Sequence, residues 1–213
     1  MLSTVQHDFP KEAPEVQMFF PWGDMRHAAH HDDLTNLANR RCLKTHLRSP
    51  AMLAGIARGV VGVLVIDIDN LKEVNARFGH GAGDVAICHV ADTLRAQSGS
   101  DDLVGRTGGD EFTVILQEVV DLSVLERVGR RIIERIEVPV PFNDALCRIS
   151  ASIGTVWIQN SKAATRETVL EDADIALYAS KNKGRAQQTF YTPALRETAN
   201  ATTPPKGRGE KKV

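Results

Sequence analysis

Two acidic residues stand directly in front of an apolar strand in RTGGDEFTVIL, Arg106 to Leu116. Asp is a poor strand former and neighbouring carboxylates repel each other, so Asp110 and Glu111 need a reason to lie at this point. Another pair of acids, Asp67 and Asp69, ends an earlier apolar run. Side chains two residues apart on a strand project to the same face, so this second pair shares one face.

Asp67, Asp110 and Glu111 converge if the strand that ends at Asp67 neighbours the hairpin at Gly108-Gly109. Carboxylates so close together stay ionised only with a cation among them, and a ligand set of oxygens alone favours Mg²⁺ or Mn²⁺ over zinc. The alternative is that Gly108-Gly109 is an ordinary hairpin turn and Asp110 a solvated turn acid, because Gly-rich turns flanked by acids are common. Spacing alone leaves both interpretations open.

Other residues suit a phosphate ligand. The stretch FGHGAGD at residues 78–84 brings backbone N–H groups within reach of phosphates, although such glycines by themselves more often form a plain turn. Lys72 lies about one helical turn beyond Asp67, and Lys181 and Arg185 lie four residues apart on or just past a helix. A solvated helix face explains each of these cations equally well.

The elements that must position these residues follow from the apolar spacing. The pattern predicts a helix over Asp24 to His31, a helix from Asn39 to about Arg58 that is interrupted near Pro50, and a buried strand over Val60 to Asp67. A short helix, a Gly-rich turn and a longer helix over Ala82 to Gln97 come next. The remaining elements are strands at Leu103–Thr107 and Glu111–Gln117, a helix over Leu122–Ile136, two strands around Ala145–Ile158, a helix over Arg166–Lys183 and a strand at Gln187–Tyr191.

Strands and helices interleave around an antiparallel hairpin, which predicts an α+β fold with a central sheet of about five strands and helices packed on it. We expect positive φ angles at Gly108 and Gly109, since a tight primed turn requires them. The predicted domain covers residues 24–191. Residues 1–23 are expected to be a flexible segment and residues 192–213 a disordered basic tail, because both are rich in Pro or polar residues and lack periodicity.

Composition restricts the class of protein. A chain of 213 residues with 42% hydrophobic and 25% charged residues is long enough for one well-buried domain. The formal net charge of −1 gives no sign of a nucleic-acid or membrane-surface partner. The three cysteines fit neither a disulfide framework nor a zinc cluster, and the longest apolar run has the length of a strand. These features favour a cytoplasmic protein without a membrane segment.

Five ordered blocks of the chain resemble the catalytic domain of the diguanylate cyclases, the GGDEF family. The signature is unaltered at Gly108 to Phe112, and the resemblance covers about Asp32 to Tyr191. The blocks are DDLTNLANRR, DIDNLKEVNARFGHGAGD, RTGGDEF, ISASIGT and ADIALYASKNKGR. The resemblance implies the palm-like fold of nucleotidyl cyclases, with a βαβ-type core, and the condensation of two GTP molecules into cyclic di-GMP with release of two pyrophosphates.

The resemblance also implies roles for single residues. Asp67, the backbone carbonyl of Ile68 and Asp110 would hold two Mg²⁺ or Mn²⁺ ions per active site, with Glu111 beside them and Asp110 as the usual candidate for general base. Two such cations lower the pKa of a ribose 3′-OH and neutralise charge on the phosphates. Lys72 joins this catalytic group.

Further positions correspond to substrate contacts of the family. Asn75 and Asp84 fall where guanine is read, with His80 between them. The N1–H and N2 amine of guanine are adjacent donors suited to a carboxylate such as Asp84, whereas the N1 of adenine is an acceptor and is repelled. The remaining substrate contacts implied are Lys181 and Arg185 at the phosphates, and Gly108 and Gly109, which let GTP approach.

The chain departs from the family pattern at a few positions. The departures are Leu71 for Phe, Ala76 for Asp, Asn36 for Gly and Ala186 for Asn. Many family members also carry an Arg-x-x-Asp motif that binds cyclic di-GMP and shuts the enzyme down; here Asp102 is in place but Gly99 occupies the Arg position. The cluster His27, His30 and His31 suggests either a metal or haem site or a plain helix face, and no further ligand spacing supports the metal.

Two other functions compete with a diguanylate cyclase. One is a catalytically silent domain that binds GTP or cyclic di-GMP and acts through a partner, and the other is a cyclase that makes a mixed GMP-AMP product, which Asp84 disfavours. The implied fold holds one GTP per protomer, so two protomers must face each other as a homodimer for catalysis. About 30 residues precede Asp32, too few for a sensing domain, so control would come from a short helix, an upstream sensor or a partner protein.

Overall fold

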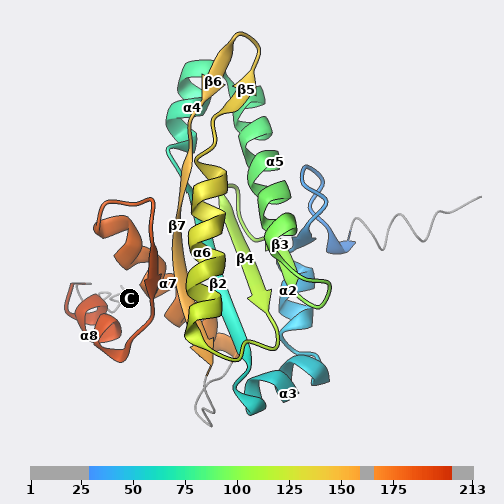
Figure 1. The fold of residues 1–213 in the computed structure, drawn as a ribbon, viewed down its shortest axis with the longest axis vertical. Helices are drawn as coiled ribbons and strands as arrows, with labels where there is room; N and C mark the ends of the chain where they lie inside the picture. Colours follow the sequence, from blue (N-terminus) through green and yellow to red (C-terminus); the bar gives the residue numbers. More distant parts are fainter. Residues whose placement is uncertain (1–28, 159–165, 203–213) are drawn as a thin grey trace, which may run out of the picture.

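The computed structural model describes residues 29–158 and 166–202. The flexible segment expected at residues 1–23, residues 24–28 of the helix expected over Asp24 to His31, and the last part of the expected tail lie outside these ranges. The described residues form a mixed sheet with helices on both faces (Figure 1). The α+β class is therefore confirmed.

The central sheet has six strands in the order β1-β3-β4-β2-β7-β8. The strand β1 is parallel to β3, β7 is parallel to β8, and all other neighbours are antiparallel. The sequence predicts about five strands, because a two-residue strand such as β1 is too short to show an alternation of apolar and polar residues. The strands are β1 (Ala38–Asn39), β2 (Val61–Asp69), β3 (Leu103–Arg106), β4 (Glu111–Leu116), β7 (Ser150–Ile158) and β8 (Gln188–Phe190).

The central strand β2 is buried along its whole length, as expected for an apolar run covered on both faces. It pairs with β4 through Asp67 opposite Glu111, and with β7 through Asp69 opposite Ser150. Residues directly opposite each other in a sheet project to the same face. The acids at the end of β2 and the first residue of β4 therefore lie on one face, at one end of the sheet.

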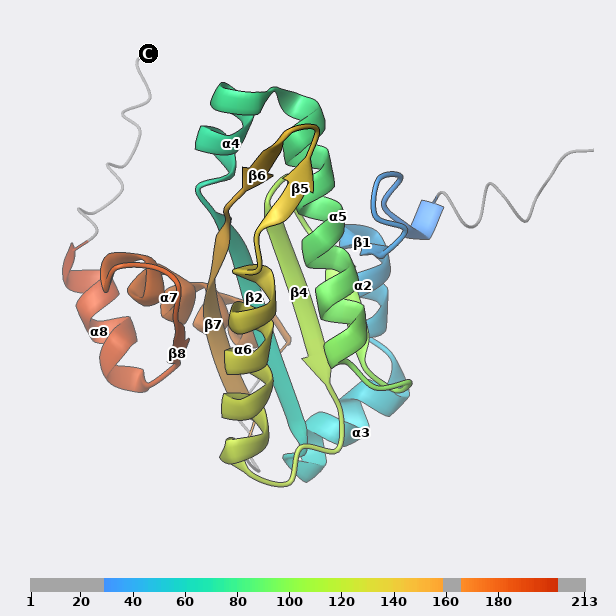
Figure 2. The ribbon, with the colours of Figure 1, turned by 45° about the horizontal axis from the view of Figure 1, so that its top comes forward.

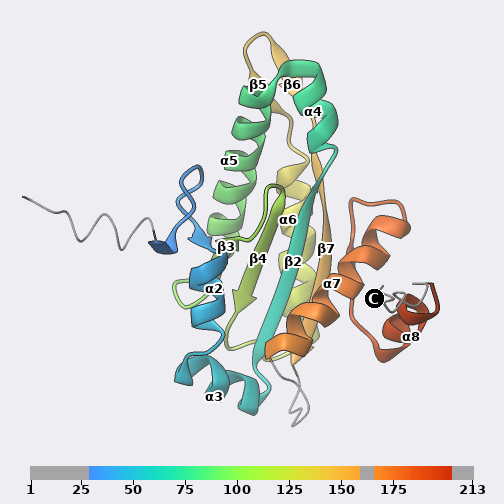
Figure 3. The ribbon, with the colours of Figure 1, turned by 180° about the vertical axis from the view of Figure 1, so that it is seen from behind.

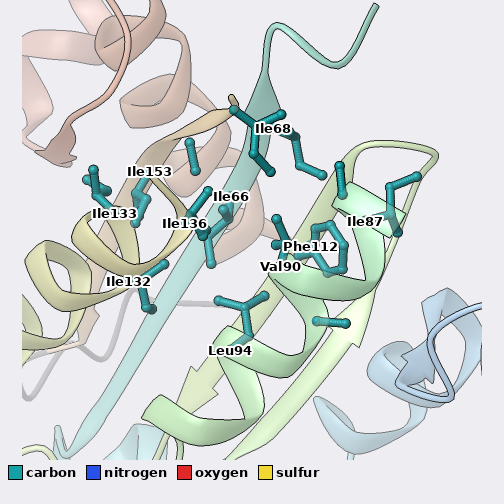
Figure 4. Packing of buried hydrophobic residues seen from close by; sticks show 14 of the residues in the cluster. Ile66, Ile68, Ile87, Val90, Leu94, Phe112, Ile132, Ile133, Ile136 and Ile153 are labelled. Atoms are coloured by element: carbon teal, nitrogen blue, oxygen red, sulfur yellow. The ribbon is translucent and has the colours of Figure 1, made fainter. Parts of the chain in front are cut away.

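One face of the sheet is covered by α5 (His80–Gln97) and α6 (Leu122–Ile136). Figure 4 shows Phe112 of β4 beside Val90 and Leu94 of α5, and the isoleucines of α6 facing Ile66 of β2. Phe112 is fully buried. Helix α6 has the predicted bounds, because its apolar residues recur at the helical period from its first turn to its last.

The opposite face is covered by α2 (Arg40–His46), α3 (Pro50–Arg58) and α7 (Arg166–Asn182), as Figure 3 shows from behind. The break expected near Pro50 is confirmed, since Ser49 caps α3 and Pro50 is its first residue. Gly154 of β7 makes the close contact with α7 possible, because a Cβ there would lie 2.1 Å from the carbonyl oxygen of Ala173. Strand β7, helix α7 and strand β8 form a βαβ unit, as expected.

The short helix α4 (Leu71–Phe78) and the hairpin of β5 (Val140–Phe142) and β6 (Ala145–Cys147) lie at the same end of the molecule as the carboxyl end of β2 (Figure 2). The Gly-rich stretch after α4 is expected to be a turn, but α5 already begins at His80. Only Gly79, with φ of 85°, breaks the helical path. Gly81 and Gly83 are tolerated in the first turn because a helix end does not require strong helix formers.

Two further expectations are wrong. Residues 193–202 form the helix α8 (Pro193–Thr202), where a disordered tail is expected. A tertiary contact stabilises it: Arg196 of α8 donates from Nε to the Asp172 carboxylate of α7 at 3.2 Å and to the Tyr191 hydroxyl at 3.2 Å. The prediction of disorder rests on composition, which does not detect such a docking contact.

The connection between β3 and β4 is not a two-residue primed turn. It spans residues 107–110, and neither Gly108 nor Gly109 has a positive φ. The Thr107 N–H donates to the Glu111 carbonyl at 2.9 Å, and the Asp110 carbonyl accepts the Ile68 N–H of β2 at 3.0 Å. A four-residue connection tied to β2 in this way does not need the left-handed conformation of a primed turn.

Candidate active site

A cavity of about 260 Å³ opens at the carboxyl end of β2. Its walls come from the end of β2, the first turn of α4, the β3–β4 connection and the end of α7. The lining residues are Asp67, Ile68, Asp69, Asn70, Leu71, Lys72, Glu73, Asp110, Lys181 and Arg185. The cavity therefore brings together acids and cations that the sequence analysis singled out, although they are far apart in sequence. The acids are Asp67, Asp69 and Asp110, and the cations are Lys72, Lys181 and Arg185.

Asp67 and Asp69 are both buried acids of this cavity, and Asp67 is the one in contact with a lysine. The Lys181 Nζ lies 2.7 Å from its Oδ2. Burial raises the pKa of Asp67, the bond from Lys181 lowers it, and the charges of Asp110 and Asp69 raise it again, so that the pKa ends above its usual value. The Asp67 carboxylate thus lacks enough positive charge around it even with Lys181 in contact.

Asp110 lies on the loop that bends over the end of β2. Its carbonyl accepts the Ile68 N–H, so the residue that carries the second acid is fixed against the strand that carries the first. Arg106 holds the other side of this loop, with Nη2 donating to the Gly109 carbonyl at 2.7 Å. Its Nη1 donates to Asp32 at 3.0 Å, which ties the loop to the segment before β1.

The two signature glycines are not explained by internal packing. A Cβ on Gly109 would meet nothing within 4 Å, and a Cβ on Gly108 would meet first the flexible end of Glu111, at 2.8 Å. Since neither residue has a positive φ, the backbone conformation does not require glycine either. What the missing side chains leave is open space beside Asp110, which suits the close approach of a ligand.

Glu111 lies outside this cavity. It lines a neighbouring cavity of about 110 Å³ together with Arg40, Lys44 and Asp174. Burial and the charge of Glu111 raise the pKa of Asp174. The structure therefore places Glu111 on the same sheet face as Asp67 but does not bring it among the residues that line the first cavity.

Asn75 of α4 presents a buried acceptor. Its Oδ1 is shielded from solvent and has no hydrogen-bond partner among the residues that the structure describes. Gly83 of α5 permits the close approach of the two helices, because a Cβ there would lie 2.0 Å from this oxygen. Asp84 and His80 are exposed on the first turns of the same helix. A buried carbonyl oxygen left unpaired costs free energy and therefore suggests a donor supplied by a ligand.

The donor set fits a divalent cation. Asp67 and Asp110 offer carboxylates and Ile68 offers a backbone carbonyl, and these are the kinds of oxygen ligand that Mg²⁺ and Mn²⁺ prefer. Among the described residues no three Asp, Glu, His or Cys side chains are grouped to hold a metal.

The six-stranded mixed sheet, with carboxylates and cations at the end of its central strand, defines an α+β domain of the palm-like class. Comparison with known proteins identifies the family. The model of "Diguanylate cyclase, GGDEF domain" matches residues 29–187, so the chain belongs to the GGDEF family. Both the recognition of this family and the palm-like fold are confirmed.

Relatives of known name are diguanylate cyclases. The chain is 36% identical over 165 residues to the diguanylate cyclase TpbB of Pseudomonas aeruginosa and 33% identical over 165 residues to DgcM of Escherichia coli. These matches cover 77% and 76% of this chain but only 38% of each relative. The chain thus spans less than two fifths of the length of these relatives.

Solved structures agree. The GGDEF domain of TpbB superposes with a TM-score of 0.75 at 33% identity, covering 80% of this chain and 99% of that one. The coiled coil and GGDEF domain of DgcB from Caulobacter crescentus, in complex with cyclic di-GMP, gives a TM-score of 0.72 at 28% identity, covering 79% and 89%. SiaD of Pseudomonas aeruginosa, in complex with its activator SiaC, gives 0.70 at 27% identity, covering 78% and 64%.

The structure brings half of the predicted site residues into the lining of one cavity, and their individual roles stay predictions. Glu111 is the exception within the metal set, and the guanine positions lie on α4 and α5 outside the cavity's lining. Asp69 was not assigned a role from sequence, although its place two residues from Asp67 could have indicated one. Asp174 gives no such signal, since only the packing of α7 on the sheet places it near Glu111.

No described helix is long and apolar enough to cross a membrane.

Proposed function

We propose that this chain is the catalytic domain of a diguanylate cyclase, which condenses two GTP molecules into cyclic di-GMP and two pyrophosphates. The observation that carries the proposal is the cavity in which Asp67, Ile68 and Asp110 lie beside Lys72, Lys181 and Arg185, in a domain of the GGDEF family. Oxygen ligands next to a group of cations suit a triphosphate bound with a divalent metal.

Bound to Asp67, the Ile68 carbonyl and Asp110, two Mg²⁺ or Mn²⁺ ions would supply activation of the ribose 3′-OH and charge neutralisation at the α-phosphate. The chain's own residues would accept the proton and bind the phosphates. Asp110 is placed at the mouth of the cavity, where a carboxylate is able to accept the 3′-OH proton. Lys72, Lys181 and Arg185 hold the phosphates and stabilise the negative charge that grows on the leaving pyrophosphate.

The ion pair of Lys181 with Asp67 must rearrange when metal and GTP bind. Lys181 then exchanges its carboxylate partner for a phosphate, which requires only rotation of a flexible side chain. The first turn of α4 also lines the cavity, and its free backbone N–H groups suit an anion. Glu111 takes part from the neighbouring cavity, beside the metal set rather than within it.

GTP would be selected by Asn75 and Asp84. The unpaired Oδ1 of Asn75 is an acceptor, and so is the Asp84 carboxylate, which matches the adjacent N1–H and N2 donors of guanine. The open space at Gly109 leaves room for the nucleotide beside Asp110. Since each domain holds one GTP, catalysis takes place in a homodimer whose two half-sites face each other.

The test is an assay of the purified chain with GTP and Mg²⁺, in which cyclic di-GMP and pyrophosphate are identified by chromatography and mass. Asp110→Ala should abolish product while circular dichroism and thermal unfolding stay near those of the parent, because the residue lies on a loop and fills no core. Omission of the divalent metal should likewise abolish product. A parent chain that binds GTP but forms no cyclic di-GMP at any protein concentration would contradict the proposal.

The second candidate, a catalytically silent domain that acts through a partner, has one observation in its favour. The Lys181 ammonium already neutralises part of the charge on Asp67 without a metal. Such a domain would bind GTP or cyclic di-GMP with an affinity that does not depend on Mg²⁺. The same assay separates the two, since only the cyclase shows metal-dependent turnover.

The cellular setting is also proposed. A cytoplasmic location follows from the need for GTP, and control by an upstream sensor or by a partner protein is suggested by SiaD, whose structure contains its activator SiaC. We place the domain at residues 24–191. Neither nucleic acid nor membrane lipid is expected as a partner, because the formal net charge is only −1.

A further inference from the structure

Asp69, the last residue of β2, has a different environment from Asp67. Its side chain is 3% exposed. The Ser152 hydroxyl of β7 donates to both of its oxygens, at 2.9 and 3.0 Å, and the Ala186 N–H donates to Oδ2 at 3.1 Å. Arg185 Nε lies 3.8 Å from Oδ1. The carboxylate thus accepts from one buried side-chain hydroxyl and one backbone N–H, and it lies beside one cation of the cavity.

The segment that Asp69 holds has an unfavourable backbone conformation. Gly184, Arg185 and Ala186 are three consecutive residues with positive φ, at 113°, 65° and 48°. Only glycine adopts this region freely, since a Cβ there approaches the following carbonyl oxygen. Arg185 and Ala186 would relax toward other conformations unless a tertiary contact opposed it. The hydrogen bond from the Ala186 N–H to Asp69 is such a contact.

The conformation of this turn determines where the Arg185 guanidinium lies. Arg185 lines the cavity with Lys72 and Lys181, yet its side chain is 59% exposed and is not held by packing. An exposed arginine on a relaxed backbone would have to be ordered again each time a phosphate binds, at a cost in entropy. A fixed turn with a carboxylate next to Nε removes part of that cost.

We propose that Asp69 is a positioning residue, which holds the turn at residues 184–186 so that Arg185 faces the triphosphate. This inference rests on the proposed function for its substrate. It assigns different roles to two acids that lie on the same face of β2. Asp67 would bind the metal, and Asp69 would position Arg185, which binds the phosphates. The oxygens of Asp69 are already committed to Ser152 and Ala186, whereas Asp67 is bonded only by the flexible Lys181 among the described residues.

Three variants separate these roles. Asp69→Asn keeps the shape, with Oδ1 able to accept from Ala186 and Nδ2 able to donate to Ser152, and removes only the charge. Asp69→Ala removes the acceptor altogether. Ala186→Gly, added to Asp69→Ala, lets the turn keep its conformation without the hydrogen bond, because glycine adopts positive φ freely. Asp33→Ala is the matched control at an exposed acid.

Binding of GTP and of inorganic triphosphate, each with Mg²⁺, is measured by calorimetry. Asp69→Ala should weaken the binding of both ligands about tenfold, and Arg185→Ala should have the same effect. A variant that combines Asp69→Ala with Arg185→Ala should bind no more weakly than Arg185→Ala alone. Asp69→Asn should weaken binding only about threefold, and Ala186→Gly should restore most of the affinity lost in Asp69→Ala. In the active enzyme the change should appear in KM more than in kcat.

Other outcomes overturn the inference. If Asp69→Asn abolishes metal-dependent turnover and shifts the Mg²⁺ titration, then Asp69 is a metal ligand. If the effects of Asp69→Ala and Arg185→Ala add, or if Asp69→Ala binds triphosphate like the parent, then the carboxylate does not act through Arg185.

Hydrogen exchange gives a readout that does not depend on turnover. The Ala186 amide should exchange faster in Asp69→Ala than in the parent or in Asp33→Ala, and its protection should persist in Asp69→Asn. A parent that makes no cyclic di-GMP would refute the proposed function alone, since triphosphate binding and exchange still decide the role of Asp69. Unchanged exchange at Ala186 in Asp69→Ala would refute the positioning role whatever the activity.

Discussion

At the scale of single residues, the site contains polar groups that the folded chain stabilises incompletely. Asp67 keeps a raised pKa despite contact with Lys181, and Asn75 buries an acceptor without a donor. Folding alone would select against the arrangement at Asn75, because an unpaired buried polar group costs about 1–3 kcal/mol, and against that at Asp67, because burial disfavours its charged form. Binding of a metal or a nucleotide would recover that free energy, and these residues therefore carry the functional proposal.

Asn75 provides a prediction at this scale. Asn75→Ala should lower the affinity for GTP at least tenfold, because an acceptor for the guanine edge is lost, while the melting temperature stays the same or rises. Calorimetry with GTP and thermal unfolding measure the two effects. Val74→Ala, the neighbouring buried core position of α4, is the control and should instead lower the melting temperature. Equal loss of stability in the two variants would show that Asn75 is a structural residue.

At the scale of elements, two connections do most to shape the site. The β3–β4 connection brings Asp110 onto the end of β2, and the turn after α7 brings Arg185 to the same cavity. Both depend on bonds between segments far apart in sequence: Arg106 to Asp32 for the first, and Asp69 to Ala186 for the second. The stability of these two elements is therefore open to separate tests.

Ala186 is predicted to be strained. It has φ of 48° and is exposed, and Asn tolerates the left-handed region better than Ala does. Ala186→Asn should raise the free energy of unfolding by about 0.5–1 kcal/mol, measured by urea denaturation. The same substitution at Ala76, an exposed position within helix α4, should lower it by about 0.5 kcal/mol. A destabilising effect at residue 186 would contradict the argument from strain.

The ion pair of Asp32 with Arg106 predicts a pH dependence. Burial raises the pKa of Asp32, but the bonds from Thr35 and the bond and charge of Arg106 outweigh it and hold the pKa below its usual value. A carboxylate with a lowered pKa stabilises the fold above its unfolded pKa, and this stability is lost as the pH falls through the folded pKa. Asp32→Asn should therefore destabilise the domain at pH 7 and reduce its loss of stability below about pH 4.

Urea denaturation between pH 7 and pH 3 measures this effect. Asp33→Asn, at the exposed neighbouring acid, is the control and should follow the parent at every pH. If Asp32→Asn loses stability on acidification as steeply as the parent does, the ion pair is not the source of the pH dependence.

At the scale of the whole molecule, one domain carries one cavity of this kind, whereas the proposed reaction joins two nucleotides. Two copies of the chain must then meet with their cavities facing each other. The family relatives are longer than this chain and include a protein with an activator bound. The encounter of two domains is the step that such segments or partners would regulate.

Specific activity should therefore rise with protein concentration while the dimer is only partly formed, because the reacting species is a pair of protomers. The measurement is the initial rate of cyclic di-GMP formation per protomer from nanomolar to micromolar protein. Mixing the parent with an excess of Asp110→Ala should lower the rate, since mixed pairs lack one half-site. A rate per protomer that does not change over this range or on mixing would indicate that a single protomer is sufficient.

Product inhibition should be weak. Gly99 stands where the inhibitory motif of the family has Arg, and Asp102 already accepts the Gly99 N–H of its own loop at 2.7 Å and the N–H of Gln117, just after β4, at 2.9 Å. Without a guanidinium fork, this loop cannot pair bidentately with phosphate or guanine. Progress curves should continue to consume GTP without an early stall. Submicromolar binding of two cyclic di-GMP molecules per protomer, lost on Asp102→Ala, would contradict this prediction.

The sequence by itself determined the residue types and most elements. Local periodicity is sufficient to place α6 at Leu122–Ile136, and the two-residue period places Asp67 and Asp69 on one face, because these are properties of neighbours along the chain. The order of the motif blocks was sufficient to recognise the family. Asp110 beside β2 was expected, but only on the condition that the hairpin neighbours that strand.

Only the tertiary structure decided how distant residues meet. It paired Lys181 with Asp67 and bonded Asp69 to Ser152 and Ala186. It also placed Glu111 in the lining of a neighbouring cavity. It also folded α8 against α7 through Arg196, where composition had suggested disorder. Such contacts depend on the packing of α7 against the sheet, and no local pattern encodes them, because the free energy of each contact depends on both partners and on the burial around them.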